Sequence, residues 1–195
     1  NSLDDINLSE VPAINFSTDL LKINGENYGS WGFDFRMEDE VAIFEELDAS
    51  VAGLRILPSS MLEWKVSDAL DVSRIAADIE IDDLAVTMSE FGFASSIEGR
   101  DFKISTDVSW LGSPAEIDFE RLTGQVDIHE GKGRFVQAET GGALKLLGIF
   151  DFASIARRLR LDFSDVLDKG FEFSEITGVT ALNDGQVAML EPIVI

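Results

Sequence analysis

The chain has 195 residues, of which 45% are hydrophobic, so it can form one sizeable core or one elongated sheet. Its 37 acidic and 15 basic residues give a formal charge of −22 at pH 7. This charge repels phosphates and anionic lipid head groups at long range, and it excludes nucleic acid as an expected partner. The absence of cysteine excludes disulfides and thiolate chemistry.

The chain begins at Asn1 without a methionine, a basic leader or an apolar signal segment. It also has no run of about 18 apolar residues that could span a bilayer. We therefore expect a piece of a longer protein, with any anchor outside this sequence.

Alternation of apolar and polar residues dominates, which is typical of strands with one buried and one wet face. The apolar positions that alternate are, in chain order, Trp31, Phe33, Phe35 and Met37; Leu62, Trp64 and Val66; Ile75, Ala77, Ile79 and Ile81; Phe102, Ile104, Val108 and Trp110; Val126 and Ile128; and Phe171 and Phe173. Turn-forming residues predict turns at 24–25, 57–60, 99–101, 112–114, 131–133 and 183–185. This pattern favours an antiparallel meander.

Two segments break the alternation and are predicted to be helical. Residues 83–91 place Leu84, Met88 and Phe91 at helical spacing behind an aspartate that can cap the helix. Residues of about 142–160 form a second helix that is apolar around most of its circumference, so we expect it to be buried against or inside the apolar face of the sheet.

Residues suited to catalysis or metal binding are few. His129 is the one histidine, and the alternation places it opposite Ile128 on the wet face of a strand. Asp78, Glu80 and Asp82 share one strand face, which predicts a solvated acidic surface, with weak calcium binding as the alternative. We therefore expect no enzyme activity, no cofactor and no metal.

The stretch from Gly141 to Phe150, the run Ala156 to Val166, and the strand Gly170 to Phe173 with Ile176 and Gly178 together resemble the C-terminal signature of YhdP-type AsmA-like bacterial envelope proteins. The turn from Trp110 to Pro114 is similar to a Trp-x-Gly-x-Pro turn of the same family.

The resemblance implies one segment, residues 1–195, of a larger protein that is anchored in the inner membrane and extends into the periplasm. The implied fold is mainly β: an elongated, curved antiparallel sheet, folded over into a groove, with one or two helices on its apolar face. The implied function is intermembrane phospholipid transport, with phospholipid acyl chains and the rest of the parent chain as partners.

An apolar groove removes the cost of exposing acyl chains to water, which is about 0.8 kcal/mol for each CH₂ group. The side chains predicted to line the groove are Trp31, Phe33, Phe35, Leu62, Trp64, Ile104, Val108 and Trp110. A sandwich core would show the same alternation at each of these positions.

The apolar helix is predicted to plug, gate or cap the groove through Leu144, Leu147, Gly148, Phe150 and Phe152. The basic cluster of Arg157, Arg158 and Arg160 is either a solvated helix face or a contact to a lipid head group or partner protein. An alternative function is therefore a docking module that binds an outer-membrane or envelope protein.

Overall fold

The computed structural model describes residues 11–23, 25–67, 70–91, 97–118, 121–135, 171–184 and 186–190. In this part of the chain the strands are β1 (Ile14–Thr18), β2 (Lys22–Ile23), β3 (Glu26–Asn27), β4 (Ser30–Glu38), β5 (Val41–Val51), β6 (Leu54–Lys65), β7 (Val72–Asp83), β8 (Ile97–Leu111), β9 (Thr123–Phe135), β10 (Phe171–Phe173), β11 (Gly178–Asn183) and β12 (Gln186–Met189). The helices are α1 (Leu84–Glu90) and a 3-10 turn, η3 (Pro114–Glu116).

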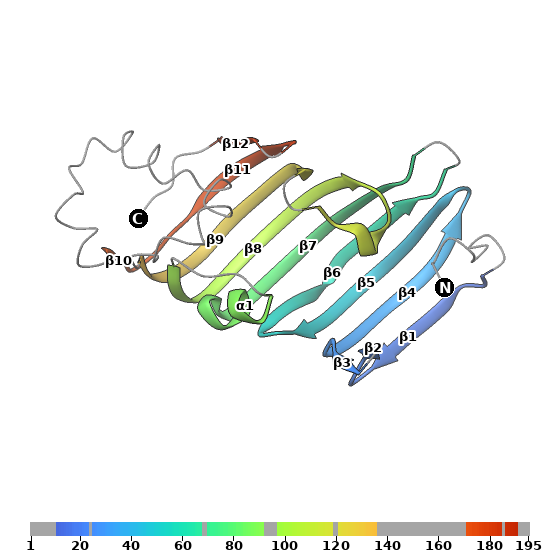
Figure 1. Cartoon of the computed structure of the whole chain (residues 1–195), viewed down its shortest axis with the longest axis horizontal. Helices are drawn as coiled ribbons and strands as arrows, with labels where there is room; N and C mark the ends of the chain where they lie inside the picture. Colours follow the sequence, from blue (N-terminus) through green and yellow to red (C-terminus); the bar gives the residue numbers. More distant parts are fainter. Residues whose placement is uncertain are drawn as a thin grey trace.

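The strands form one long antiparallel sheet in the order β1-β4-β5-β6-β7-β8-β9-β11-β12, with β2 and β3 in a separate hairpin (Figure 1). From β4 to β9 each strand pairs with the next strand in the chain, which is the predicted meander. The sheet is open, with β1 and β12 at its two edges. The expectation of a mainly β protein built on an elongated antiparallel sheet is confirmed.

Strands β10 and β11 both pair with β9 on the side away from β8. Together they form one interrupted strand along β9, and the interruption covers Ser174 to Thr177. In the interruption the backbone N–H of Ile176 donates to the carbonyl of Gly131 at 2.8 Å.

The register places apolar residues of successive strands side by side. Phe35 lies opposite Phe44, Phe44 opposite Leu62, Leu62 opposite Ile75, and Ile75 opposite Val108. Because side chains alternate between the faces of a sheet, these residues share one face.

The neighbouring row is polar. It aligns Glu63 with Arg74 and Arg74 with Ser109, so these side chains belong to the other face. The period-two alternation of the sequence therefore becomes two unlike faces of one sheet.

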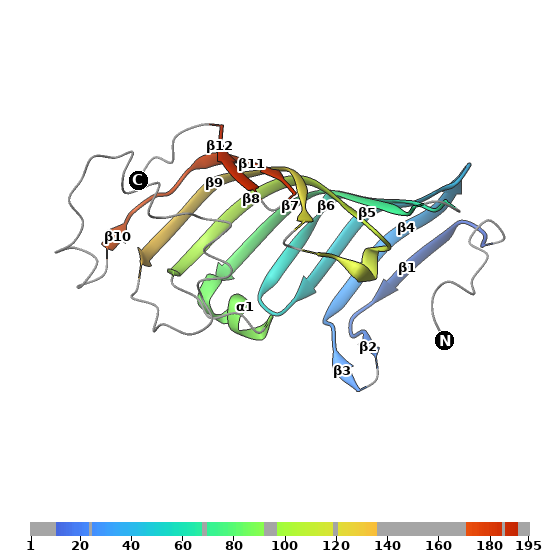
Figure 2. The same cartoon turned by 45° about the horizontal axis from the view of Figure 1, so that its top comes forward.

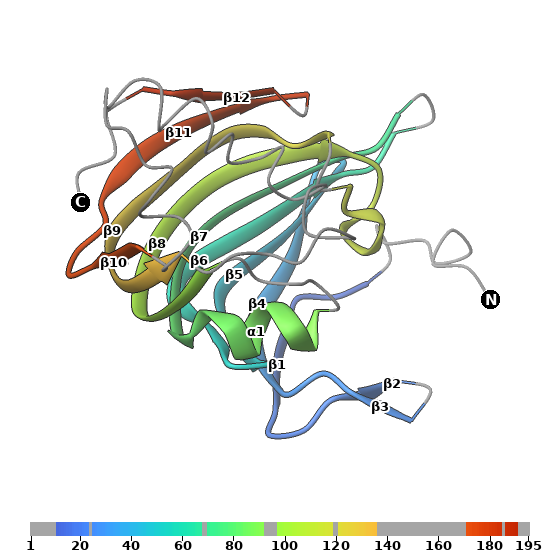
Figure 3. The same cartoon turned by 60° about the vertical axis from the view of Figure 1, so that its left-hand side comes forward.

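Helix α1 confirms the helix predicted over residues 83–91. Asp83 caps it, because its Oδ1 accepts a hydrogen bond from the backbone N–H of Val86 at 3.2 Å. Leu84 packs against the apolar face, as does Leu122 in the segment that follows η3. The sheet bends toward these two coverings, which lie at opposite ends of the strands (Figures 2 and 3).

The turn predictions at 112–114 and 183–185 are confirmed, since both positions lie where strands end. Those at 57–60, 99–101 and 131–133 are wrong, since these residues lie inside β6, β8 and β9. The pairing shifts register between Ile56 and Met61, and again between Arg100 and Lys103. In these strands proline and glycine occur at bulges and at crowded positions. Both residues are as compatible with such positions as they are with turns.

Candidate functional site

The apolar face of the sheet carries four clusters of buried side chains. One contains Phe35, Ala42 and Trp64. A second contains Leu47, Ala49, Ile56 and Ala77. A third contains Val108, Trp110, Leu122 and Leu182. The fourth contains Ile81, Phe102, Ile128, Phe173 and Ile176.

Half-buried residues join these clusters into one surface, because each packs against two of them. Phe33 joins the first and second clusters. Leu62 and Ile75 join the second and third. Leu54 and Ile79 join the second and fourth. We call this continuous surface, from β4 to β11, the apolar face.

All eight residues predicted to line a groove lie on the apolar face. Four of them are buried within its clusters: Phe35, Trp64, Val108 and Trp110. The other four are half-buried and pack against the clusters: Trp31, Phe33, Leu62 and Ile104. The structure thus brings the eight residues onto one surface, while their contact with lipid stays a prediction.

Sequence reasoning missed the contribution of β5. Phe44 contacts both Phe33 and Phe35, with ring centroids 5.3 Å and 5.2 Å apart. Glu45 and Glu46 interrupt the alternation after Phe44, and Glu46 takes a left-handed φ of 49°. The register shifts there, so the strand continues with its apolar residues still on the same face.

The indole N–H groups of the three tryptophans of the apolar face all have acceptors. Trp31 donates to the carbonyl of Tyr28 at 2.6 Å, and Trp110 donates to the carbonyl of Ser113 at 3.0 Å. Trp64 donates to Oδ2 of Asp71 at 3.2 Å. Since their polar atoms are satisfied, the rings add apolar surface without an unpaired donor.

The opposite face carries ion pairs between neighbouring strands, and we call it the charged face. Its cross-strand pairs include Arg36–Glu45 at 3.1 Å, Arg55–Glu80 at 2.5 Å, Arg74–Glu63 at 2.9 Å, Arg74–Asp107 at 2.7 Å and Lys103–Glu130 at 2.5 Å. Because every one of these side chains is at least a quarter exposed to solvent, each pair contributes little to stability on its own.

Two of these pairs lower the pKa of a carboxyl group. Arg74 donates two hydrogen bonds to Asp107, which lowers the pKa of that carboxyl below its usual value. Arg36 lowers the pKa of Glu45 in the same way, chiefly through its side-chain hydrogen bonds.

His129 lies on the charged face, as the alternation predicts. Its Nε2 is 2.8 Å from Oγ of Ser105, and Ser105 donates to Asp78 at 2.6 Å. Ser59 donates to the same carboxylate, and these two hydrogen bonds lower the pKa of Asp78. The four side chains form a polar network across β6, β7, β8 and β9. Among the described residues, no three metal-binding side chains gather.

The helix predicted over 142–160 lies outside the described residues. The same is true of its proposed plug residues Leu144, Leu147, Gly148, Phe150 and Phe152, and of Arg157, Arg158 and Arg160. Their roles remain predictions.

The Trp-x-Gly-x-Pro turn closes the η3 end of the sheet. Gly112 has a φ of 106°, and its carbonyl accepts a hydrogen bond from Oγ of Ser73 at 2.8 Å. Glu116 accepts hydrogen bonds from the N–H and hydroxyl of Ser113, which lowers the pKa of Glu116. This turn therefore holds Trp110 at the end of the apolar face.

Strand β10 and the segment that follows it also contribute side chains to the apolar face. Phe173 and Ile176 are both buried in the cluster that contains Phe102 and Ile128. Gly131 makes room for this packing, because a Cβ there would come within 2.6 Å of the Phe102 ring.

These observations define an open antiparallel sheet protein with one continuous apolar face and one charged face. A model of the YhdP protein family matches residues 1–194, so the chain belongs to the YhdP family, as the sequence resemblance indicates. The intermembrane phospholipid transporter YhdP of Escherichia coli (strain K12) is 26% identical over 160 residues. That alignment covers 80% of this chain and 13% of the relative.

No solved structure matches the chain. Within the described residues, no helix has the length and apolar character needed to cross a membrane.

Proposed function

We propose that this chain is a segment of an intermembrane phospholipid transporter, and that its apolar face contacts the acyl chains of lipids in transit. The continuity of the apolar face from β4 to β11 is the observation that carries the proposal. Membership of the YhdP family and similarity to the E. coli transporter support it. The role is one of binding and conducting lipid, without catalysis.

Lipid acyl chains are costly to expose to water. Each CH₂ group exposed costs about 0.8 kcal/mol, so an unbroken apolar surface lowers the barrier along the whole path. The half-buried residues Phe33, Leu62 and Ile104 have exposed apolar area with which to make such contacts. The curvature of the sheet lets the apolar face line a groove (Figure 3).

We place the segment in the periplasm, as part of a longer protein anchored in the inner membrane. The described strands lie about 4.8 Å apart, so the sheet extends about 40 Å from edge to edge. A sheet of that length cannot bridge two membranes by itself, so this segment would supply only part of the path. This agrees with an alignment that covers 13% of the relative.

The test compares two neighbouring positions of β6 that lie on opposite faces. A photoreactive benzoylphenylalanine at Leu62 reports on the apolar face, and the same residue at Glu63 is the matched control on the charged face. In cells, Leu62 is expected to give phospholipid adducts that mass spectrometry identifies, while Glu63 gives few. Adducts from Leu62 to protein alone would favour the docking function, and equal lipid labelling from both positions would refute the proposal.

A further inference from the structure

The two coverings of the apolar face are held to the sheet in different ways. At the η3 end, the indole of Trp110 donates a hydrogen bond to the carbonyl of Ser113. The hydroxyl of Ser73, in the neighbouring strand, donates to the carbonyl of Gly112. Leu122, which this covering contributes to the apolar face, is buried. The covering at the η3 end is therefore a fixed part of the fold.

Helix α1, the covering at the other end, has a smaller set of contacts. Leu84 packs against the cluster that contains Phe102, and Thr87 is the one buried residue of the helix. The hydrogen bond of its N-terminal cap lies within the segment itself. Within the described part of the chain, no hydrogen bond joins residues 84–90 to another strand or turn.

The contact between α1 and the sheet includes a buried hydroxyl group. Thr87 is 3% exposed, and its Oγ1 has no hydrogen-bond partner among the described residues. This oxygen faces the turn between β5 and β6, where a Cβ at Gly53 would lie 3.0 Å from it. Burial of a hydroxyl without a partner costs free energy, because the group loses its hydrogen bond to water. The packed position of α1 carries this cost, and a position away from the sheet does not.

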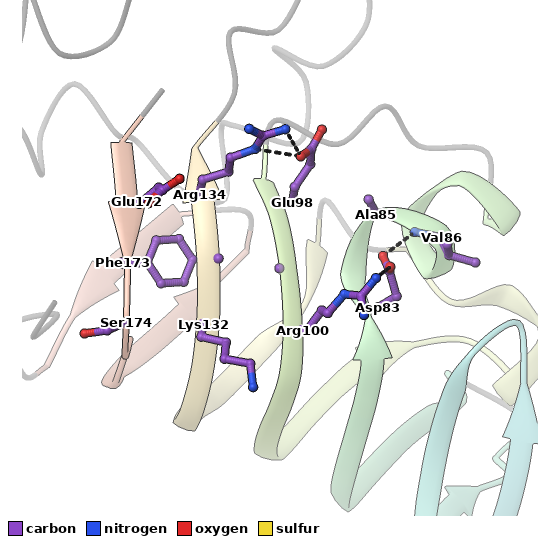
Figure 4. Close-up of a pocket in the computed structure, with 12 residues that line it drawn as sticks. Asp83, Ala85, Val86, Glu98, Arg100, Lys132, Arg134, Glu172, Phe173 and Ser174 are labelled. Carbon is purple, nitrogen blue, oxygen red and sulfur yellow. Dashed lines mark hydrogen bonds and ion pairs between the residues drawn. The ribbon is translucent and has the colours of Figure 1, made fainter. Parts of the chain in front are cut away.

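One side of α1 borders open space. Ala85 and Val86, in its first turn, line a cavity of about 930 Å³ between the start of the helix and strand β10 (Figure 4). The side chain of Val86 is largely exposed. The packing that holds the helix on the sheet is therefore confined to the side that carries Leu84 and Thr87.

The residue that precedes α1 is fixed to the sheet. Asp83 is the last residue of β7 and lies opposite Arg100 of β8 in the register. The two side chains also form an ion pair at 3.6 Å. Since the strand holds one end of the helix, a change of backbone angles between Asp83 and Leu84 would lift α1 without disturbing the sheet.

We propose that α1 is a lid on the apolar face. In the closed position, which the structure shows, Leu84 occupies the surface beside Phe102. In the open position this surface is available to the acyl chain of a lipid. The unpaired hydroxyl of Thr87 keeps the closed position weak enough for the lid to open. The inference rests on the proposed function and adds to it the step that admits lipid.

The test replaces Thr87 by valine, which has nearly the same shape and lacks the hydroxyl. The 195-residue chain is mixed with phosphatidylcholine vesicles that contain pyrene-labelled phosphatidylcholine, and the loss of excimer emission measures the rate of lipid uptake. Because Thr87→Val removes the cost of the closed position, we expect it to slow uptake about fivefold. Leu84→Ala, which weakens the closed position, should speed uptake.

Hydrogen exchange gives a second measurement that needs no lipid. A helix of seven residues is not stable by itself in water, so its amides exchange when the lid opens. The amide of Phe91, which donates to the carbonyl of Thr87 at 3.2 Å, is one such reporter. Thr87→Val should slow this exchange by the same factor as lipid uptake.

Val86→Thr is the matched control, because it makes the reverse change at the neighbouring, exposed position. It should alter neither rate. If Thr87→Val slows exchange but not uptake, α1 is a static cap, and the inference fails while the proposed function stands. Unchanged exchange in Thr87→Val would also overturn the inference. If neither the unmodified chain nor any variant takes up lipid, the inference and the proposed function fail together.

Discussion

The two faces of the sheet follow the same strands yet are held together by different interactions. On the apolar face, buried side chains from neighbouring strands pack into clusters that are joined by shared residues. On the charged face, exposed side chains meet in separate ion pairs between strands. Burial contributes far more per residue than an exposed ion pair does, so the apolar face dominates the stability of the sheet.

The largest expected effect is the difference in stability between substitutions at two neighbouring residues of β8 that lie on opposite faces. Phe102 is 5% exposed in the apolar cluster, whereas Lys103 is largely exposed and paired with Glu130. Phe102→Ala should lower the free energy of unfolding by about 3–5 kcal/mol, because it leaves a cavity in the cluster. Lys103→Ala should cost about 1 kcal/mol or less. Urea denaturation of both variants measures the difference, and similar losses would contradict the contrast between the faces.

A smaller effect is expected from a single methyl group added to the apolar face. In Gly133→Ala the new Cβ would lie 2.2 Å from the carbonyl oxygen of Glu98 and 2.6 Å from Cα of Gly99. Since both neighbours are backbone atoms, relief requires β8 and β9 to move apart, at about 2–3 kcal/mol.

Gly32→Ala is the matched control for this substitution, since its nearest neighbours lie at 3.8 Å or beyond. It should be neutral or slightly stabilising in the same urea titration. A loss of stability in both variants would mean that the strands simply disfavour alanine.

The glycines of β9 also show how far the sequence could predict this fold. Alternation correctly predicts a mainly β chain and the apolar positions from Trp31 to Trp110, and the helical spacing that breaks it after Asp83 correctly predicts α1. It cannot distinguish a glycine that turns the chain from a glycine that makes room for a neighbour. At Gly131 the neighbour is the ring of Phe102, which belongs to a different strand. That contact depends on register, which the local sequence does not encode.

The site was predictable to a similar extent. The sequence identifies the residues of the apolar face, because their period is local. It misses Phe44, because Glu45 and Glu46 follow it and break the alternation of β5. The bulge at Glu46, which keeps the apolar residues of β5 on one face, becomes visible only in the pairing with β6.

A third test concerns the turn that holds Trp110 at the end of the apolar face. Gly112 has a φ of 106°, a conformation that costs alanine energy. Gly112→Ala should therefore lower the free energy of unfolding by about 1–2 kcal/mol. The change should be visible in the tryptophan fluorescence of the chain, to which Trp110 contributes, in the same urea titration. An unchanged midpoint would show that the turn adapts freely to another conformation.

The smallest expected effect belongs to the charged face and depends on pH. Arg74 lowers the pKa of Asp107 from its usual value of 3.8, so the folded state favours the charged carboxylate. Stability from this pair is therefore present above about pH 4 and is lost as the pH falls through the lowered pKa. Because Asp107 is 52% exposed, solvent screening limits the contribution to about 1 kcal/mol or less.

Arg74→Gln should remove part of the acid sensitivity of the free energy of unfolding, with little change at pH 7. Raising the salt concentration should have the same effect in the unmodified chain, since salt screens exposed pairs. Urea titrations between pH 2.5 and pH 7 would measure both effects. If Arg74→Gln instead cost as much as Phe102→Ala at neutral pH, the charged face would stabilise the sheet as strongly as the apolar face does. The contrast between the two faces would then fail.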